Sequence, residues 1–364
     1  MIIVFDNIIF SLQRAGGISA FWSKLIRGTM ESGLFDCRFI EDDNARKNIF
    51  RRELKIPEEK IIHSRRLSIR SLLFAVKVPS KISRQPFIFH SSYYRQCIDS
   101  KAINVTTVHD FIHENGLQGS WVSRRVFSIV KRNVMSASRA LICVSRTTRD
   151  ELLKRYPSFG DKIIDVAYNA PVVRESASKV PKKGKEYLLF VGARGGYKHF
   201  MFACRLAAME RMKLVIAGEP IKAKERLALL KYWGLKYEVE LRPDNKRMAQ
   251  LYAGAHCLLY PSEMEGFGLP IVEAQSYGCP VLTMKRSAMP ETGGAGALYL
   301  SDYDVRQGLE LMRKLRNRSF RSKLVALGKQ NVQRFSWENA VDSYIALYKR
   351  LAEESNDYLG LSAV

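Results

Sequence analysis

The segment from Pro261 to Leu282 holds the residues whose types and spacing are best suited to chemistry. It reads PSEMEGFGLPIVEAQSYGCPVL and places Glu265 and Glu273 on either side of the turn Gly266-Phe267-Gly268. Glycines let the backbone approach a ligand, and free N–H groups at the start of the following helix can hold a phosphate. The two carboxylates could then accept hydrogen bonds from sugar hydroxyls. The alternative interpretation is an ordinary glycine turn before a helix.

A second candidate is FVGARGGYKHF, residues 190–200, in which three glycines follow an apolar run. The pattern satisfies neither the P-loop nor the dinucleotide-binding fingerprint. Arg194 and Lys198 are four residues apart, and two cations beside a glycine turn could neutralise a diphosphate without a metal. A solvated loop is the alternative.

Two weaker signals lie in the first half of the chain. Gly16 and Gly17 follow the apolar run Ile2–Phe5 and precede a helical pattern, so they could approach a ligand. His109 and Asp110 follow the run Asn104–Val108. A histidine at the end of a strand is more often structural than catalytic.

Short apolar runs and amphipathic stretches alternate along most of the chain, which predicts β-α-β units with both faces of each parallel sheet buried. The expected strands are 2–5, 37–40, 87–89, 104–108, 140–144, 163–167, 187–191, 213–217, 237–241, 255–260 and 280–283. The expected helices are 18–31, 68–78, 120–137, 146–155, 199–211, 222–233, 246–253, 269–277, a helical tail from about Asp304, and a last helix from Ser336 to about Glu354.

The stretch 171–186, PVVRESASKVPKKGKE, has no apolar period and is typical of a linker. We therefore predict a Rossmann-like acceptor domain over 1–172, a linker over 173–186 and a Rossmann-like donor domain over 187–335. The helix within 336–364 is expected to cross back to the first domain.

The pattern E-G-F-G-L-P-x-x-E-A resembles the signature of retaining glycosyltransferases of family 4, the glycosyl transferases group 1. The other motifs occur in a similar order: Gly16-Gly17, His109-Asp110, CVS at 143–145, VGxR with a lysine at 191–198, and PE at 290–291. Asn169-Ala170 departs from the Asn-Gly of many members. FHSSYYR at 89–95 and TVHDFIHE at 107–114 resemble a bacterial surface-polysaccharide subgroup.

This resemblance implies an α/β protein of the GT-B fold, with two Rossmann-like, doubly wound parallel-sheet domains facing a central cleft. It implies that Glu273 binds the ribose and that Arg194 and Lys198 bind the diphosphate and stabilise the leaving group. It places His109 and Glu265 near the transferred sugar. The other implied donor contacts are Gly266, Phe267, Gly268, Leu269, Gly16, Gly17 and, around the base, Leu241, Arg242 and Pro243. The implied acceptor contacts are Tyr93, Tyr94, Arg95 and Asp110.

The family transfers a sugar from a nucleotide-diphosphate sugar with retention of configuration. The resemblance implies front-face displacement through an oxocarbenium-like state, with the departing phosphate helping to deprotonate the acceptor hydroxyl. The subgroup favours GDP-mannose or a related GDP-sugar by a small margin over a UDP-hexose or UDP-N-acetylhexosamine. The expected acceptor is a polyprenyl-diphosphate-linked saccharide in O-antigen or capsule synthesis.

The chain has 364 residues, and 59 Lys and Arg against 36 Asp and Glu give it a net charge of +23. The basic residues are densest between Arg46 and Arg84, and the expected helix 120–137 sets Arg124, Arg125, Lys131 and Arg132 beside Val122, Val126, Ile129 and Val130. Basic amphipathic surfaces bind anionic bilayers, so we expect an anionic membrane surface as a partner. A solvated basic face is the alternative.

Other function classes have less support. There is no zinc finger, helix-turn-helix or RNP-type motif, so nucleic acid is not an expected partner. A sugar-nucleotide epimerase or phosphorylase of the same fold stays an alternative. We expect no metal: His109 and His113 lack a further ligand cluster, and Asp302-x-Asp304, which resembles a metal-binding D-x-D pair, precedes a helix and favours an N-terminal cap.

The expected location is cytoplasmic, peripheral on the inner face of the membrane. The six cysteines are far apart and form no C-x-x-C, which favours a reduced setting. The start MIIVFDN does not resemble a signal peptide, and no uncharged apolar run reaches the length of a membrane span.

Overall fold

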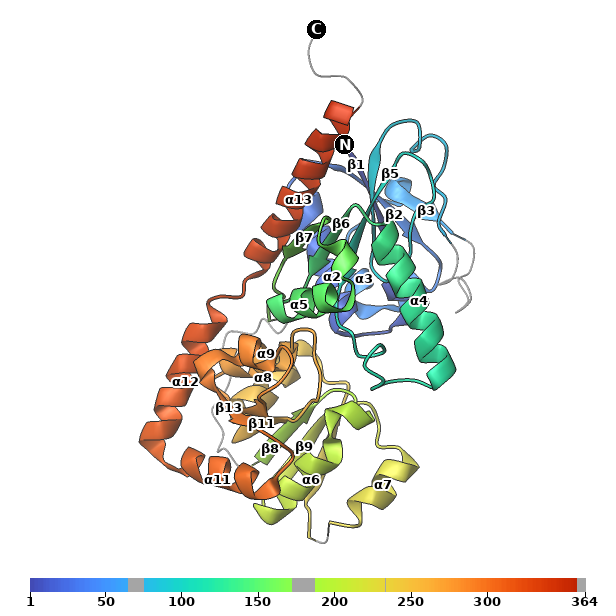
Figure 1. Ribbon diagram of the computed structural model, residues 1–364. Coiled ribbons are helices and arrows are strands. Elements are labelled where there is room, and N and C mark those ends of the chain that lie inside the picture. The colour runs from blue at the N-terminus through green and yellow to red at the C-terminus, as the bar shows by residue number, and fades with distance from the viewer. Residues whose placement is uncertain (65–74, 172–186, 233, 359–364) are drawn as a thin grey trace. The chain divides into compact units, whose positions relative to one another are not determined.

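The computed structural model describes residues 1–64, 75–171, 187–232 and 234–358, which form two compact units. The first unit comprises Met1–Glu114, Gly119–Asn169 and Trp337–Val364, and the second comprises Asn115–Gln118 and Ala170–Ser336. Each contains a sheet whose strands are all parallel, as Figure 1 shows with its labels. The predicted α/β class with two parallel-sheet domains is therefore confirmed. The expected linker 173–186 and most of the expected helix 68–78 lie outside the described residues.

Seven described strands form the first sheet, in the order β3-β2-β1-β4-β5-β6-β7. The neighbours of β1 are β2 and β4, so Phe5 lies between Phe39 and His90. Strand β3 was not predicted, since Ile61 and Ile62 are only partly buried, His63 is exposed, and the three residues do not form a longer apolar run. The bounds are β1 Ile2–Asp6, β2 Asp36–Glu41, β3 Ile61–His63, β4 Phe87–Ser91, β5 Ala102–Val108, β6 Ala140–Cys143 and β7 Ile163–Val166.

Successive residues of β1 are buried on opposite faces of this sheet. Ile3 and Phe5 pack in a cluster with Trp22 and Tyr348, whereas Val4 packs with Phe89. Burial on both faces explains the continuous apolar runs seen in the sequence. The helices of the unit are α1 Ile8–Leu12, α2 Gly17–Glu31, α3 Ile49–Arg52, α4 Trp121–Ala137, α5 Arg146–Arg155 and α13 Trp337–Tyr358, with short 3-10 turns η1 Ala45–Lys47, η2 Glu58–Lys60 and η4 Pro157–Phe159.

Lys131 on α4 corrects one expectation about the basic face of this helix. Its side chain is buried rather than turned to solvent, and its Nζ lies 3.1 Å from Glu114 and 4.0 Å from the centre of the Phe111 ring. Burial lowers the pKa of Lys131, and Glu114 opposes that shift. The sequence pattern could not show this because Glu114 belongs to a loop outside the helix.

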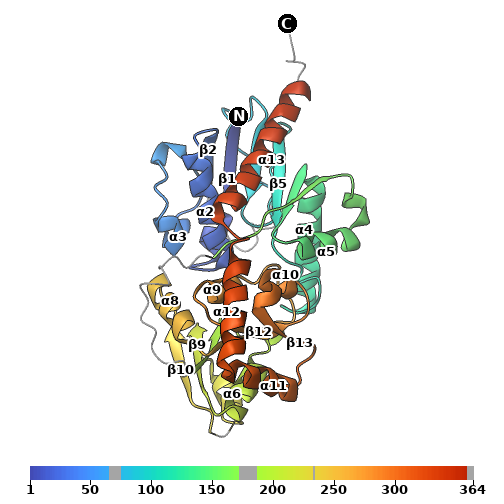
Figure 2. The same ribbon diagram turned by 90° about the vertical axis from the view of Figure 1, so that its left-hand side faces the viewer.

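The last helix, α13, packs within the first unit, where Figure 2 shows it running beside the strands of the first sheet. Its Tyr348 hydroxyl lies 2.6 Å from Nδ1 of His90, and Thr107 Oγ1 lies 3.0 Å from the other ring nitrogen. A Cβ added to Gly28 of α2 would lie 2.6 Å from Val341 of α13, so the two helices approach closely. Glycine on one helix therefore admits the branched side chain on the other.

We expect His90 to make the first unit less stable as the pH falls. Burial lowers the pKa of His90 to about 3, against 6.5 for an ordinary histidine. Between about pH 3 and pH 6.5, His90 is therefore protonated in the unfolded chain but neutral in the folded chain. Its contribution to the free energy of unfolding is complete above about pH 6.5 and decreases as the pH falls below that value. The loss is at most about 1.4 kcal/mol per pH unit. Urea unfolding at about pH 7 and about pH 5 measures it.

The matched variants for this measurement are His90→Gln and His63→Gln. His63 on β3 is exposed, and its Nε2 lies 3.1 Å from the equally exposed Glu58. Water screens such a surface pair, so replacing His63 should change the pH dependence far less than replacing His90. A pH dependence that is the same in His90→Gln as in the wild type would contradict the assignment.

Six described strands form the second sheet, in the order β10-β9-β8-β11-β12-β13, and one apolar cluster packs around it. The strands are β8 Tyr187–Val191, β9 Lys213–Gly218, β10 Tyr237–Leu241, β11 Cys257–Tyr260, β12 Val281–Met284 and β13 Ala297–Leu300. The helices are α6 Phe200–Met209, α7 Ala223–Leu229, α8 Asn245–Gly254, α9 Leu269–Ser276, α10 Met289–Gly293, α11 Val305–Arg316 and α12 Arg318–Val332, with 3-10 turns η6 Gly196–Lys198 and η7 Gly294–Gly296.

Local signals explain where several of these helices begin. Asp244 caps α8 and Asn317 caps α12, each by accepting a backbone N–H in the first turn. Asp304 accepts from the N–H of Arg306 at 2.8 Å and so caps α11, as its sequence position predicted. Among the described helices, none combines the length and the hydropathy that a membrane span requires.

Candidate functional site

The strand order of the second sheet reverses between β8 and β11. The chain runs outward from β8 through β9 to β10, returns to β11, and then runs through β12 to β13. Parallel pairing places the carboxyl ends of β8 and β11 side by side. In open α/β sheets, ligands bind beyond the carboxyl ends of the strands at such a switch point. The loops that follow these two strands contain Lys198 and Glu265.

Lys198 and Glu265 form an ion pair at this switch point. Nζ of Lys198 contacts Oε1 of Glu265 and lies 3.3 Å from the Tyr260 hydroxyl. Both charged side chains are only 11% exposed. Burial and the neighbouring carboxylate of Glu265 raise the pKa of Tyr260. The structure thus brings together two residues that were predicted from separate motifs.

Neighbouring side chains hold the loop of Lys198 in place. His199 is left-handed, with φ 44°, and its ring stacks on Tyr303 with centroids 3.6 Å apart. Its Nε2 lies 3.1 Å from Glu263, whose N–H donates to the carbonyl of Tyr197 at 2.7 Å. These contacts join the segments on either side of the ion pair.

Ser287 and Thr292 hold the loop of Glu265. The Ser287 hydroxyl donates to the carbonyl of Glu265 at 2.8 Å and accepts its N–H at 3.2 Å. Thr292 donates to the carbonyl of Phe267 at 2.5 Å. Ser287, Thr292 and His199 were not among the predicted site residues, because their partners are distant in the chain and no motif links them.

The turn Gly266-Phe267-Gly268 leads directly into α9. Gly268 has φ 94°, a left-handed conformation that suits glycine, and an added Cβ would lie 3.2 Å from Ile271. Leu269 is the first residue of α9, Pro270 follows it and has no N–H, and the N–H of Ile271 donates to the carbonyl of Gly268 at 2.9 Å. The positive end of the helix dipole follows the turn and is suited to an anionic ligand; that a donor binds there stays a prediction.

Glu273 lies within α9 and is buried. Its Oε2 accepts a hydrogen bond from the Tyr252 hydroxyl at 2.8 Å. Burial raises the pKa of Tyr252, and the carboxylate raises it further, so Tyr252 is a hydrogen-bond donor at neutral pH. The carboxylate of Glu273 is therefore held in one orientation.

Arg194 has different hydrogen-bond partners from those of the Lys198–Glu265 ion pair. Its Nη2 donates to the carbonyl of Pro220 at 2.6 Å and to Glu225 at 3.1 Å, residues that Lys198 does not contact. The Arg194 side chain is buried, and within the described part of the chain its Nε and Nη1 have no hydrogen-bond partner. Two donors of this cation are therefore buried and unpaired among the described residues, and their contact with a diphosphate stays a prediction.

Leu241, Arg242 and Pro243 follow the edge strand β10. Arg242 has φ 45°, and its guanidinium binds both carboxylate oxygens of Glu219, with Nε to Oε1 at 2.9 Å and Nη2 to Oε2 at 2.6 Å. The side chain of Leu241 is exposed. An apolar surface beside a fixed backbone could accept a planar ring.

His109 follows β5 of the first unit and is buried. Burial lowers its pKa to about 4, so the ring is neutral at neutral pH. Its backbone N–H donates to the Tyr94 hydroxyl at 3.4 Å, and its ring packs edge-on against Phe21. Among the described residues its Nε2 finds no hydrogen-bond partner. A role for this atom toward a ligand stays a prediction.

The glycines predicted at the start of the chain lie at the beginning of α2. Gly16 is the residue before the helix and is extended, with φ 174°, while Gly17 is the first helical residue. A Cβ on Gly16 would lie 2.3 Å from Oε1 of Gln13. A larger residue at Gly16 would therefore displace Gln13.

The predicted acceptor residues are mostly engaged in packing. Arg95 is buried and its Nη1 lies 3.2 Å from Asp6, while Tyr93 and Tyr94 pack against Phe127. The carbonyl of Asp110 accepts a hydrogen bond from Lys131. Their role toward a ligand stays a prediction. No group of three or more potential metal-binding side chains occurs in the parts of the chain that the structure describes.

Residues 173–331 match the model of a protein family described as Glycosyl transferases group 1. The O-antigen chain mannosyltransferase B of Escherichia coli is 27% identical over 243 residues, which cover 60% of this chain and 62% of that protein. The O-antigen chain mannosyltransferase RfbU of Salmonella typhimurium is 24% identical over 239 residues, 64% of this chain and 66% of that protein. The chain thus spans less than two thirds of the length of these curated relatives.

Two solved structures are similar over nearly the whole chain. WaaG, a glycosyltransferase involved in lipopolysaccharide biosynthesis, has a TM-score of 0.68 at 12% identity and covers 95% of this chain and 99% of its own. HepE of Anabaena, in complex with UDP and glucose, has a TM-score of 0.68 at 12% identity. The match covers 98% of this chain and 100% of the HepE chain. At these identities the likeness shows the fold, which is that of GT-B glycosyltransferases.

Proposed function

We propose that this chain, whose residues 173–331 match the glycosyl transferases group 1 family, is a glycosyltransferase. It transfers a hexose from a nucleotide-diphosphate sugar to a saccharide acceptor in surface-polysaccharide synthesis. The observation that carries this proposal is the Lys198–Glu265 ion pair at the switch point, directly before the start of α9. A buried cation beside a helix start suits a diphosphate that gains charge as it leaves.

Each site residue then has a role. Lys198 neutralises the leaving diphosphate, and Arg194 adds the two donors that have no partner within the described chain. Glu265 orients Lys198 and faces the sugar, while Glu273, oriented by Tyr252, binds the ribose. The transfer retains the anomeric configuration by front-face displacement, and the departing phosphate helps to remove the acceptor proton. An NMR assignment of the product anomer tests the retention.

The donor we propose is GDP-mannose or a related GDP-sugar, with its base beside Leu241–Pro243. Two relatives that carry the word mannosyltransferase in their names support this choice. We further propose that no metal is needed, because Lys198 and Arg194 supply the positive charge. If the protein binds UDP rather than GDP, a UDP-sugar replaces GDP-mannose as the proposed donor.

A thermal-shift panel with UDP, GDP, ADP and CMP tests the nucleotide. We expect GDP to stabilise the protein, by about 2.7 kcal/mol at 100 times its Kd, and expect the same shift with EDTA present. A shift that requires Mg²⁺ would contradict metal independence. If none of the four nucleotides shifts the melting temperature, the proposed donor site is wrong. Release of an epimerised sugar nucleotide would instead favour the epimerase alternative.

We also propose that the protein is cytoplasmic and docks on the inner face of the membrane through α4, where its polyprenyl-diphosphate-linked acceptor is held. Val122, Val126 and Ile129 lie on one face of α4 at helical spacing, and each is exposed, as is Trp121. Arg125 and Arg132 of the same helix are also exposed. Figure 1 shows α4 within the first unit. An exposed apolar face with flanking arginines matches an anionic interface.

Vesicle cosedimentation at low salt measures this docking. We expect anionic vesicles to bind the protein more strongly than neutral ones, and we expect Trp121→Ser with Ile129→Ser to weaken that binding severalfold. The matched control is Leu227→Ser with Leu230→Ser, which removes two exposed apolar side chains from the second unit. Equal binding to neutral and anionic vesicles would show that the arginines do not direct the protein to the membrane.

A further inference from the structure

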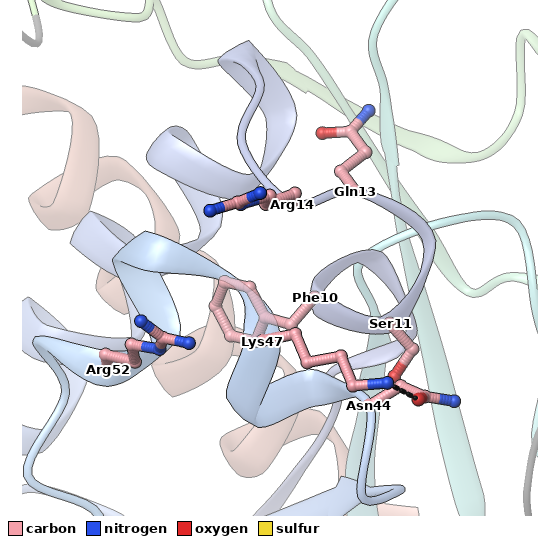
Figure 3. A pocket seen from close by; sticks show the side chains of 7 residues that line it. All are labelled: Phe10, Ser11, Gln13, Arg14, Asn44, Lys47 and Arg52. Carbon is pink, nitrogen blue, oxygen red and sulfur yellow. Dashed lines mark hydrogen bonds between the residues drawn. The ribbon is translucent and has the colours of Figure 1, made fainter. Parts of the chain in front are cut away.

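A cavity of about 450 Å³ lies in the first unit between the segments that follow β1 and β2. Figure 3 shows the side chains that line it, from α1 and the residues after it on one side and from η1 and α3 on the other. Its volume lies within the range of about 300–1,000 Å³ that is common for small-molecule sites. The lining residues are Phe10, Ser11, Gln13, Arg14, Asn44, Lys47 and Arg52. None of these residues was predicted to belong to a site.

Three cations surround this cavity without acidic partners. No ion pair among the described residues includes Arg14, Lys47 or Arg52. The neighbouring arginines differ: Arg46 is paired with Glu58 and Arg51 with Glu41. All three side chains are exposed, and Nε of Arg52 donates to the carbonyl of Arg46 at 3.0 Å. Their remaining donors are solvated and can turn to a bound anion.

Figure 3 shows that the guanidinium groups of Arg14 and Arg52 lie on the same side of the cavity and come from different segments. Nζ of Lys47 turns toward Asn44, whose Oδ1 it contacts at 3.0 Å. Two guanidinium groups and one ammonium group are the side chains that most often bind phosphate. The charge and the donor types therefore favour a phosphate group.

The cavity also offers a neutral acceptor. Oε1 of Gln13 is buried and, in the described part of the chain, has no hydrogen-bond partner. Asn48 connects the two sides of the cavity, because its side chain donates to the carbonyl of Gln13 at 2.7 Å and also caps α3. A buried acceptor without a donor is costly. The atom is covered by its surroundings, so the Gln13 amide must turn before a ligand hydroxyl can satisfy it. Phosphate and hydroxyl groups occur together in a phosphorylated sugar.

The cavity is at the functional edge of the first sheet. The segments that form it leave the carboxyl ends of β1 and β2, the edge at which ligands bind in open α/β sheets. Gly16, the residue before α2, adjoins the cavity through Gln13. A ligand at this edge would lie beside a loop that belongs to the proposed machinery.

We propose that this cavity binds a sugar that carries a phosphate group, as the anionic part of the acceptor; this rests on the proposed function. The three cations hold the phosphate, and Gln13 accepts a hydroxyl of the sugar. The site thereby selects a negatively charged acceptor over a neutral one.

Calorimetric titration of the full chain with mannose 6-phosphate tests the proposal. We expect the triple variant R14Q/K47Q/R52Q to bind this probe at least about tenfold more weakly than the wild type, since each charged hydrogen bond contributes strongly. The matched control K81Q/K101Q/K154Q removes the same charge from exposed lysines of the same unit and should bind normally. Methyl mannoside, which lacks the phosphate, should bind tenfold more weakly than mannose 6-phosphate.

Further arms separate the competing explanations. Inorganic phosphate that binds as tightly as the sugar phosphate would overturn the sugar assignment. A loss in Lys198→Ala but not in the triple variant would place the phosphate at the donor site and overturn the proposal. R14Q alone serves if the triple variant fails to fold. If no nucleotide stabilises the protein while the triple variant still loses the probe, the proposed function fails and the cavity assignment stands.

Discussion

Replacing Lys198 or Glu265 by alanine should slow the single-turnover rate of sugar transfer by about 100-fold or more. The two side chains contact each other at the switch point and are only 11% exposed, so bulk water cannot replace them. Lys198 stabilises the negative charge that develops on the diphosphate only as the bond to the transferred sugar breaks. Binding of the nucleoside diphosphate should therefore fall less than the rate. Rapid-quench kinetics and calorimetry measure the two quantities.

The ion pair between Lys213 and Glu238 supplies the matched control. It joins the same residue types in the same unit, but both side chains are more than 40% exposed on β9 and β10. Lys213→Ala should change neither rate nor binding, because solvent screens an exposed pair. Unchanged single-turnover rates in both Lys198→Ala and Glu265→Ala would remove these residues from the chemistry.

Arg51→Ala should lower the free energy of unfolding of the first unit by about 3–5 kcal/mol. Nε of Arg51 lies 2.6 Å from Glu41, and the side chains are 8% and 3% exposed. Glu41 also accepts a hydrogen bond from Asn7 at 2.6 Å, and Asn7 accepts one from Trp22 at 2.7 Å. Removal of the cation leaves a buried carboxylate without its charge partner. Urea unfolding followed by tryptophan fluorescence measures the loss.

Arg46→Ala is the matched control for this experiment. Arg46 also pairs with a glutamate, Glu58, but the side chains are 61% and 62% exposed, so the expected loss is about 0–1 kcal/mol. The double variant Arg51→Met with Glu41→Gln should recover part of the stability because no buried charge is left unpaired. Equal losses in Arg51→Ala and Arg46→Ala would show that burial does not decide the energy of these pairs.

The helices and strands were predictable where local patterns determine them. The expected helix 146–155 coincides with α5, and the expected strand 37–40 lies within β2. These elements have caps or continuous apolar runs, which act over a few residues. Strand β3 was missed because it forms only through pairing with β2, and its own residues carry no such pattern.

The motifs of the candidate site were predictable from the sequence, but the residues that hold its turns in place were not. Lys198 and Glu265 stand in glycine turns after apolar strands, so the sequence indicated both. Tyr303, which stacks on His199, and Ser287, which bonds to Glu265, contact those turns from distant segments, and no spacing in the chain could reveal them. The contacts of Arg194 with Pro220 and Glu225 were equally hidden.

The sequence by itself determined the doubly wound α/β class, the glycine turns and the excess of positive charge, because these depend on residue type and short-range periodicity. Only the tertiary structure decided which charges have partners. It buried Lys131 against Glu114 and Arg51 against Glu41, and it left Arg14, Lys47 and Arg52 around one cavity without acidic partners among the described residues. The physical reason is that a charge interacts through space, so its partner depends on how distant segments pack.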